Sequence, residues 1–197
     1  MEKILIIDFG SQYTQLIARR IREMQVYCEI VPFNKYSPGL LAGDVRGVVL
    51  SGSPCSVASP DAPRIDLSGI RGVLPLLGIC YGAQYLANLG GGMVEKSPTR
   101  EYGRAELVSL KQDDSLLAGL KRGSVVWMSH GDTITSVPDG FETIASTADV
   151  PVAAFHIVGE NTWGIQFHPE VHHSEQGALL LKNFVMRVCG CLAEWTS

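Results

Sequence analysis

Apolar residues gather into short runs along the first half of the chain, and polar or glycine-rich segments separate these runs. Residues 3–9 form a nearly continuous apolar run that ends at Gly10, a pattern typical of a strand buried on both faces of a parallel sheet. Apolar positions then recur with a helical period as far as Met24, and Ser11 is placed to cap this predicted helix. Further strands are predicted at residues 27–32, 45–50 and 73–79, and a further helix at 82–89. Strands that alternate with helices through short connections predict an open α/β sheet.

The second half of the chain shows short apolar stretches separated by turns. These stretches predict strands at residues 106–110, 124–128, 142–146, 152–157 and 162–167. We expect several of them to pair antiparallel, as an extension of the parallel sheet. Residues 174–188 then have the apolar periodicity of an amphipathic helix. The predicted fold is therefore a three-layer α/β fold, with an open, mixed, mostly parallel sheet and helices on both faces.

Composition and charge limit the kinds of partner. The 197 residues are 46% hydrophobic and 18% charged, which suits one globular domain with a buried core. No apolar run reaches the roughly 18–20 residues that cross a bilayer, and the first residues enter a strand without the pattern of a signal peptide. The net charge is −4, with basic residues scattered among acidic ones. We therefore expect no nucleic-acid partner and no membrane partner.

The five cysteines have irregular spacing, so we expect no disulfide framework and a cytoplasmic location. Cys189 and Cys191 are too close together for the usual zinc pair, and no second pair occurs elsewhere. His168, His172 and His173 form another candidate group. The side chains of adjacent histidines are expected to diverge, however, and no carboxylate pair completes the set. The sequence therefore predicts no metal site.

Cys80 lies between glycines directly after an apolar stretch, in the segment Gly78–Gly82. This pattern predicts a sharp turn from strand to helix that presents the thiol at a helix N-terminus, where the thiolate is favoured. A cysteine after an apolar strand is more often a buried packing residue. The flanking glycines favour a nucleophile, because a residue at a strained turn needs neighbours without Cβ atoms.

His168 and Glu170 follow another apolar stretch at a spacing that points both side chains to the same side of an extended chain. Glu170 can then accept a hydrogen bond from one imidazole nitrogen, which leaves the other nitrogen to take a thiol proton. Taken alone, the pair is more typical of a surface turn that begins at Pro169. Combined with the Cys80 turn, it predicts a Cys/His/Glu site for acyl transfer.

A loop of small residues, 51–54, follows the third predicted strand and is expected to lie beside the Cys80 turn. Ligands of parallel sheets bind at the carboxyl ends of the strands. The backbone N–H groups of Gly52 and Ser53, with that of Tyr81, are therefore candidates for an oxyanion hole. A simple turn without a catalytic role is the alternative.

Four segments of the sequence together resemble the class I (triad) glutamine amidotransferases. They are Asp8–Tyr13, Gly78–Gln84, Trp127–Asp132 and Gln166–Val171. The resemblance extends over almost the whole chain and is most specific to the amidotransferase domains of the GMP synthase family. It implies a flavodoxin-like fold, a Cys80 thiol that attacks the amide of glutamine, a His168 base that later acts as an acid, and a Glu170 carboxylate that orients His168. The residues that it implies at the glutamine substrate are Gln84, Ser129, His130, Gly131 and Asp132.

The resemblance also implies an acceptor for the ammonia that glutamine releases. In that family a second, ATP-pyrophosphatase domain uses ATP and Mg²⁺ to convert XMP to GMP. The sequence contains no Ser-Gly-Gly-Val-Asp-Ser loop of that domain. We therefore expect residues 1–190 to form the amidotransferase domain, with no cofactor of its own, and residues 191–197 to begin a connector to the synthetase domain. A homodimer of the full enzyme and a separately encoded synthetase chain both stay open.

Two alternatives remain at this point. The amidotransferase subunits that serve anthranilate, aminodeoxychorismate or carbamoyl phosphate synthesis share the same cysteine turn and His-Pro-Glu segment. A non-catalytic regulatory module of the same fold belongs to a different functional class. The intact set of Cys80, His168 and Glu170 argues against it.

Overall fold

The chain folds around one nine-stranded sheet, and the computed structural model describes all of residues 1–197 except the side chains of Thr99 and Arg100. The strands are β1 (Lys3–Asp8), β2 (Tyr27–Pro32), β3 (Val45–Leu50), β4 (Leu76–Ile79), β5 (Met93–Leu110), β6 (Val125–Ser136), β7 (Phe141–Thr147), β8 (Ala154–Ile157) and β9 (Thr162–Ile165). The α-helices are α1 (Thr14–Glu23), α2 (Tyr81–Leu89) and α3 (Gly177–Lys182). Two short 3-10 helices, η1 (Phe33–Lys35) and η2 (Pro38–Leu41), and one π-helix, η3 (Asn183–Val188), complete the structure.

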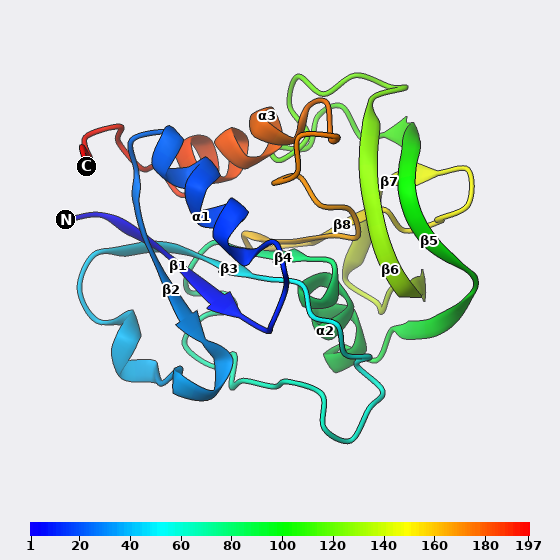
Figure 1. The fold of residues 1–197 in the computed structure, drawn as a ribbon, viewed down its shortest axis with the longest axis horizontal. Coiled ribbons are helices and arrows are strands. Elements are labelled where there is room, and N and C mark those ends of the chain that lie inside the picture. Colours follow the sequence, from blue (N-terminus) through cyan, green and yellow to red (C-terminus); the bar gives the residue numbers. More distant parts are fainter.

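The sheet has a parallel half and an antiparallel half. Its strand order is β2-β1-β3-β4-β9-β8-β7-β5-β6 (Figure 1). Neighbouring strands from β2 to β9 are parallel, and those from β9 to β6 are antiparallel. The predicted mixed α/β sheet, with an antiparallel extension contributed by the second half of the chain, is confirmed.

Helices cover both faces of the parallel half, which gives three layers. The side chains of Ile4 and Ile6 belong to the core beneath α1 and α3, whereas those of Leu5 and Ile7 belong to the core beneath α2. This division follows from strand geometry, because successive side chains point to opposite faces. In Figure 1, α1 and α3 lie together, and α2 lies apart from them across the sheet. Burial on both faces explains the continuous apolar run of β1.

The antiparallel half contains a hairpin that is much longer than the sequence pattern predicts. We expected strands at residues 106–110 and 124–128, but β5 and β6 extend to a first pair between Met93 and Ser136. Along β6, buried positions alternate with partly exposed ones. Polar residues on the outer side of the hairpin interrupt the apolar pattern, and this hides the strands from a search for apolar runs.

Two boundaries near the site also differ from the prediction. The strand expected at residues 73–79 begins only at Leu76, because the residues before it close a turn onto the carbonyl of Ile70. The side chain of Ser11 does not cap α1. The N-cap position belongs to Tyr13, and the Ser11 hydroxyl instead accepts a hydrogen bond from the Tyr13 N–H.

The helix predicted at residues 174–188 is present as two pieces. Its α-helical part begins at Gly177, and from Asn183 the backbone widens into the π-helix η3. The Asn183 amide donates hydrogen bonds to the carbonyl oxygens of Leu116 and Ala118. A buried polar side chain thus ties this helix to the loop between β5 and β6.

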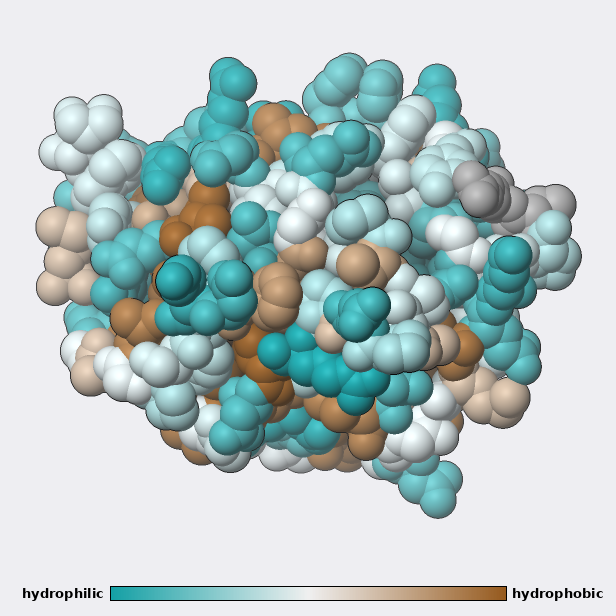
Figure 2. Space-filling model, turned by 60° about the horizontal axis from the view of Figure 1, so that its bottom comes forward, coloured by the Kyte–Doolittle hydropathy of each residue, from teal (hydrophilic) through white to brown (hydrophobic). Residues whose placement is uncertain are grey.

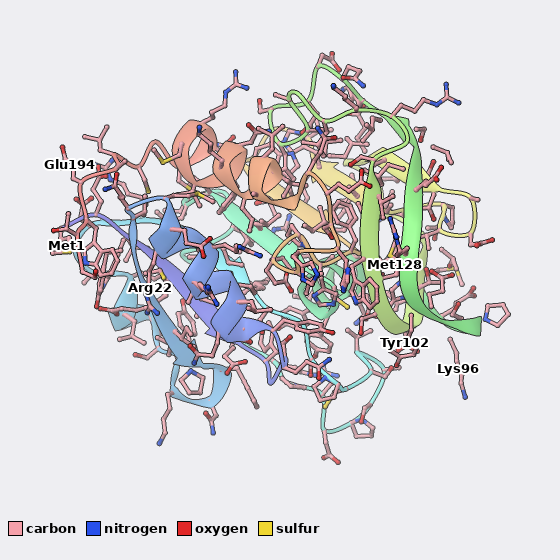
Figure 3. All side chains as sticks on the ribbon, turned by 45° about the horizontal axis from the view of Figure 1, so that its top comes forward. Met1, Arg22, Lys96, Tyr102, Met128 and Glu194 are labelled. Carbon is pink, nitrogen blue, oxygen red and sulfur yellow. The ribbon has the colours of Figure 1, made fainter. Side chains whose placement is uncertain are left out.

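The chain termini and the β5–β6 hairpin lie on opposite sides of the molecule. In Figure 3, Met1 and Glu194 lie together on one side, whereas Lys96 and Tyr102 lie on the other. The face shown in Figure 2 is largely polar, with smaller apolar patches between the polar residues. Within the described residues, no helix has the length and apolar character needed to span a bilayer.

Candidate active site

Cys80 occupies a strained turn between β4 and α2. Its backbone has φ 53° and ψ −105°, a left-handed conformation that residues with a side chain rarely adopt. A Cβ at Gly78 would come within 2.6 Å of the Gly82 backbone, and a Cβ at Gly82 within 2.6 Å of the Leu50 carbonyl oxygen. The turn therefore requires both glycines. It leaves Cys80 at the N-cap of α2, where unpaired N–H groups favour an anion.

His168 and Glu170 form a buried pair just after β9. The Nδ1 of His168 lies 2.5 Å from the Oε1 of Glu170, and the two side chains are 4% and 0% exposed. Among the described residues, the other carboxylate oxygen of Glu170 has no hydrogen-bond partner. The imidazole is therefore the main polar partner of this carboxylate, which fixes the orientation of the ring.

The charges around His168 favour its protonated form. Burial lowers the pKa of His168, but the negative charges of Glu170 and Cys80, and their hydrogen bonds to the ring, raise it well above the ordinary value of 6.5. Cys80 is thus the second ionisable neighbour of the ring. The thiol proton can move to the imidazole, which gives a thiolate beside an imidazolium.

The loop after β3 lies directly against both groups. A Cβ at Gly52 would lie 3.3 Å from Cε1 of His168 and 3.6 Å from Cβ of Cys80. The first of these distances is tighter than an ordinary contact, so a side chain at this position would press on the imidazole. The structure thereby brings Cys80, His168 and the predicted oxyanion loop to one edge of the sheet.

Neighbouring elements hold His168 in place. Its N–H donates to the carbonyl oxygen of Trp127 in β6 over 2.9 Å, and the Ser174 hydroxyl donates to its carbonyl oxygen over 2.6 Å. The Tyr13 ring meets the imidazole edge-on, with 5.0 Å between ring centroids and 70° between the ring planes. His168 is therefore fixed by backbone and aromatic contacts as well as by the carboxylate.

A cavity of about 520 Å³ opens in front of these groups. Its walls come from the loops after β1 and β3, the Cys80 turn, the β5–β6 hairpin and His168. This volume suits a small-molecule ligand. All the residues expected at the substrate line it, namely Gln84, Ser129, His130, Gly131 and Asp132.

The side chains of Gln84 and His130 brace the β6 wall of this cavity. The Nε2 of Gln84 donates to the backbone oxygen of Asp132 over 2.9 Å, and the Nδ1 of His130 lies 2.7 Å from the same oxygen. Burial lowers the pKa of His130 and raises the pKa of Glu101, whose carboxylate lies 3.2 Å from the His130 Nε2. Low polarity around this pair therefore disfavours the charged form of each group.

The backbone N–H groups predicted for an oxyanion hole are not engaged in hydrogen bonds among the described residues. Within the described structure, no group accepts a hydrogen bond from the backbone N–H of Gly52, Ser53 or Tyr81. Ser53 has no positive φ, so its side chain adds no backbone strain to the loop. Its hydroxyl accepts a hydrogen bond of 3.1 Å from the Cys55 N–H. The Tyr81 side chain points elsewhere, because its hydroxyl donates to the carbonyl oxygen of Pro63.

Within the described residues, no group of three or more His, Cys, Asp or Glu side chains is arranged to hold a metal ion. All five cysteines are unpaired, and burial raises the pKa of Cys191 to about 11 and that of Cys189 further still. Such thiols stay protonated at neutral pH. The side chains of His172 and His173 were expected to diverge, but their ring centroids lie only 3.9 Å apart. The His173 ring also stacks on Trp127.

Several residues at the site were not singled out from the sequence. Tyr13 and Gln166 belong to recognisable segments but have no predicted role. Lys96 and Tyr102 line the cavity from strands whose length was underestimated. The available signal was strongest for Gln166, which is a polar residue inside the apolar stretch that ends at Phe167. A polar residue in a fully buried run indicates a specific partner.

Comparison with protein families gives one match, to the family described as glutamine amidotransferase class-I, over residues 5–188. Two curated relatives carry the name GMP synthase (glutamine-hydrolysing). The chain is 58% identical to the Bacteroides fragilis protein over 195 residues and 61% identical to the Porphyromonas gingivalis protein over 196 residues. These alignments cover 99% and 100% of this chain. The chain spans only 38% of the length of each relative.

Solved structures match the fold over nearly the whole chain. A Thermoplasma acidophilum protein, described as a candidate component of GMP synthase, superimposes with a TM-score of 0.81 at 30% identity, covering 96% of this chain and 94% of its own. A glutamine amidotransferase of Thermotoga maritima superimposes with a TM-score of 0.77 at 17% identity, covering 96% and 99%. Because the Thermotoga maritima protein is only 17% identical to this chain, its similarity supports the fold alone.

Proposed function

We propose that this chain, which belongs to the class I glutamine amidotransferase family, hydrolyses the side-chain amide of glutamine. Cys80 is the nucleophile, His168 is the base and then the acid, and Glu170 orients His168. One observation carries this proposal: Cys80 and the His168 ring, which is paired with the buried Glu170 carboxylate, line the same cavity and both lie against Gly52. Backbone groups of residues 129–132 and the Gln84 side chain form the substrate wall.

The first half-reaction forms a thioester. The Cys80 thiolate attacks the amide carbon of glutamine, and the amide oxygen takes up negative charge. The backbone N–H groups of Gly52 or Ser53 and of Tyr81 stabilise this oxyanion. The His168 imidazolium transfers its proton to the amide nitrogen, the carbon–nitrogen bond breaks, and ammonia leaves. A γ-glutamyl thioester remains on Cys80.

The second half-reaction restores the enzyme. Neutral His168 accepts a proton from water while the water oxygen attacks the thioester carbon. The tetrahedral intermediate then collapses, the carbon–sulfur bond breaks, and glutamate leaves. Sulfur departs as a thiolate and His168 keeps its proton, so the initial ion pair with Cys80 is regenerated. The net reaction consumes one glutamine and one water and produces glutamate and ammonia.

We further propose that the ammonia converts XMP to GMP on a synthetase portion that this sequence does not include. The names of the relatives at 58% and 61% identity support this assignment. In this proposal residues 1–190 are the amidotransferase domain and residues 191–197 begin the connector. The five unpaired cysteines are compatible with a reducing cytoplasm.

The test combines this chain with synthetase portions and follows glutamine-dependent product formation. With a synthetase portion of GMP synthase, ATP, Mg²⁺ and XMP, we expect GMP to form from glutamine. The Cys80→Ala variant should form GMP only when ammonium is added. Anthranilate, aminodeoxychorismate and carbamoyl phosphate synthase partners serve as controls. Coupling to one of those partners in place of the GMP partner would overturn the pathway, and undiminished ammonia release by Cys80→Ala would overturn the mechanism.

A further inference from the structure

Gln166 contacts the nucleophile, and the mechanism above does not use it. The residue follows β9 and is fully buried. Its Nε2 lies 3.6 Å from the Sγ of Cys80, and its Oε1 accepts a hydrogen bond of 3.2 Å from the Nε2 of Gln84. A buried amide needs partners for both of its ends. Here one of those partners is the reacting sulfur.

The neighbours of Gln166 determine which end of its amide faces the sulfur. The Gln84 side chain lies 2.9 Å from the backbone oxygen of Asp132. A carbonyl oxygen only accepts hydrogen bonds, so the nitrogen of the Gln84 amide must point to it. The same nitrogen also faces Gln166, which must therefore present its oxygen. The nitrogen of Gln166 is thereby directed at Cys80.

Two neutral groups then act on the sulfur in opposite directions. The backbone oxygen of Ser129 lies 3.6 Å from the Cys80 Sγ and can only accept a hydrogen bond, so it favours the S–H form. The Gln166 N–H can only donate, so it favours the thiolate, because hydrogen bonds to ionised groups are stronger than those between neutral ones. The balance between thiol and thiolate depends on both contacts.

We propose that Gln166 stabilises the Cys80 thiolate by a side-chain hydrogen bond, and that Gln84 and Asp132 lock the amide in the orientation that makes this bond. The inference rests on the proposed function, to which it adds a residue in contact with a reacting atom. The amide does not titrate at ordinary pH, so it can donate to the sulfur whenever Cys80 is a thiolate. A stabilised thiolate is also a better leaving group when water hydrolyses the thioester, so Gln166 assists both half-reactions.

Alkylation of Cys80 by iodoacetamide tests the proposal without glutamine turnover. Gln166→Met removes the donor at similar side-chain length, and Gln166→Glu retains an acceptor for Gln84 but replaces the donor with an anion. The control Asn183→Leu removes a buried amide that bonds to the β5–β6 loop. The rate is measured against pH on the Cys80 peptide by mass spectrometry, and the thermal midpoint of each variant is recorded.

We expect the alkylation rate at pH 7 to fall about tenfold in Gln166→Met, with the midpoint of the pH profile about one unit higher, since one unit corresponds to a tenfold change in ionisation. Gln166→Glu should shift the midpoint further upward. Asn183→Leu should lower the thermal midpoint and leave the profile unchanged. Unchanged profiles in folded Gln166→Met and Gln166→Glu variants would overturn the proposal.

A second measurement uses the unmodified chain and does not depend on the stability of any Gln166 variant. The side-chain amide signals of Gln166, followed by nuclear magnetic resonance, should move with pH as Cys80 ionises. The same movement should be absent from Cys80→Ala. Gln166 amide signals that do not shift as Cys80 ionises would overturn the inference. A normal response in a chain that releases no ammonia, even with its partner, would instead contradict the proposed function alone.

Discussion

Two histidine–carboxylate pairs lie at opposite ends of β9, and only one of them adjoins a cysteine thiol. The His168 side chain is 4% exposed, whereas the His156 side chain is 25% exposed. His168 and Glu170 follow the carboxyl end of the strand. His156 lies in β8 beside the amino-terminal part of β9, where its ring nitrogen Nδ1 is 3.3 Å from the Asp114 carboxylate. The hydrogen bond to Asp114 raises the pKa of His156, as the neighbouring charges do for His168. The pairs therefore share their basic chemistry.

The second nitrogen of each ring explains the difference. The Nε2 of His156 lies 2.9 Å from the carbonyl oxygen of Glu160, and the ring stacks on Trp163 at 4.3 Å between centroids. Both nitrogens therefore face acceptors, which favours the imidazolium and leaves no site for an incoming proton. His168 instead faces Cys80. A cavity of about 350 Å³ also borders His156, but none of the described residues that line it is Cys, Ser, Thr or Lys. The two pairs therefore differ in that only the His168 ring has a cysteine thiol beside it at the wall of its cavity.

Replacing the histidine of each pair by asparagine should give the largest contrast. His168→Asn should lower the rate of glutamine hydrolysis by about 10⁴-fold, because neither proton transfer has a carrier. His156→Asn should leave the rate within about twofold and lower the thermal midpoint, because it changes the partner of the buried Asp114 carboxylate. Glutamate release in the presence of the synthetase portion, together with thermal unfolding, measures both effects. Equal losses of activity in the two variants would remove the distinction.

Replacing the carboxylate of each pair by an amide should give a smaller difference in activity between the two variants. Glu170→Gln keeps a hydrogen-bond acceptor but removes the charge that raises the pKa of His168, so we expect an activity loss of about 10²-fold and a changed pH profile. Asp114→Asn should keep the activity and lower the free energy of unfolding by about 2 kcal/mol. Rate profiles between pH 5 and 9 and chemical denaturation provide the measurements. A Glu170→Gln enzyme with the original rate and pH profile would contradict the orienting role.

A single methyl group added beside His168 should lower the rate of glutamine hydrolysis. Gly52→Ala places a Cβ 3.3 Å from the His168 ring and 3.6 Å from the Cys80 Cβ, so we expect kcat to fall about tenfold through displacement of the reacting groups. The matched control is Gly39→Ala, where the added Cβ meets only the Ser37 hydroxyl at 3.9 Å. Steady-state kinetics compare the two variants. A Gly52→Ala enzyme as active as Gly39→Ala would show that the loop tolerates the methyl group.

The smallest effect concerns the pH dependence of stability at the His156 pair. The hydrogen bond that the His156 ring donates to Asp114 raises the pKa of His156. The stability that it contributes is therefore fully present below pH 6.5 and is lost as pH rises through the raised pKa. Burial raises the pKa of Asp114, but bonds from His156, Leu116 and Trp163 lower it overall. The stability contributed by ionised Asp114 is present above pH 3.8 and is lost as pH falls through the lowered pKa of this residue.

The stability difference between the unmodified chain and Asp114→Asn should therefore be largest between about pH 4 and 6.5. Thermal midpoints of both chains measured from pH 3 to pH 9 test this window. We expect the difference between the two midpoints to be a few degrees smaller at pH 3 and at pH 9 than within the window. A difference that grows steadily up to pH 9 would mean that the pair does not ionise as described.

The parallel half of the fold could be predicted closely, and in the antiparallel half the length of the β5–β6 hairpin could not. β2 and β3 lie at the residues expected from their apolar runs, because both strands lie within the parallel half, where apolar runs mark the strands. The β5–β6 hairpin was underestimated because its outer side chains are polar. Residues such as Lys96 and Tyr102, which line the cavity from that hairpin, were therefore missed.

The groups proposed to react could be singled out because each carries a local signal in the sequence. Cys80 is flanked by glycines that the turn requires, and His168 and Glu170 share a short segment. Gln166 shows only that it is a polar residue inside an apolar stretch. Its proposed role depends on Cys80 and Gln84, which are far away in the sequence and meet it only after folding. Local patterns predict chemistry that neighbouring residues support, whereas contacts between distant segments need the structure.

Trapping the covalent intermediate tests the role of Cys80 most directly. The chain, combined with a synthetase portion of GMP synthase and glutamine, is quenched in acid during turnover, and its peptides are analysed by mass spectrometry. We expect a γ-glutamyl group on the Cys80 peptide, accumulation of this adduct in variants slow in deacylation, and no adduct in Cys80→Ser. Glutamate release at full rate with the adduct on another residue, or with an unmodified Cys80 under conditions that trap thioesters, would contradict the assignment.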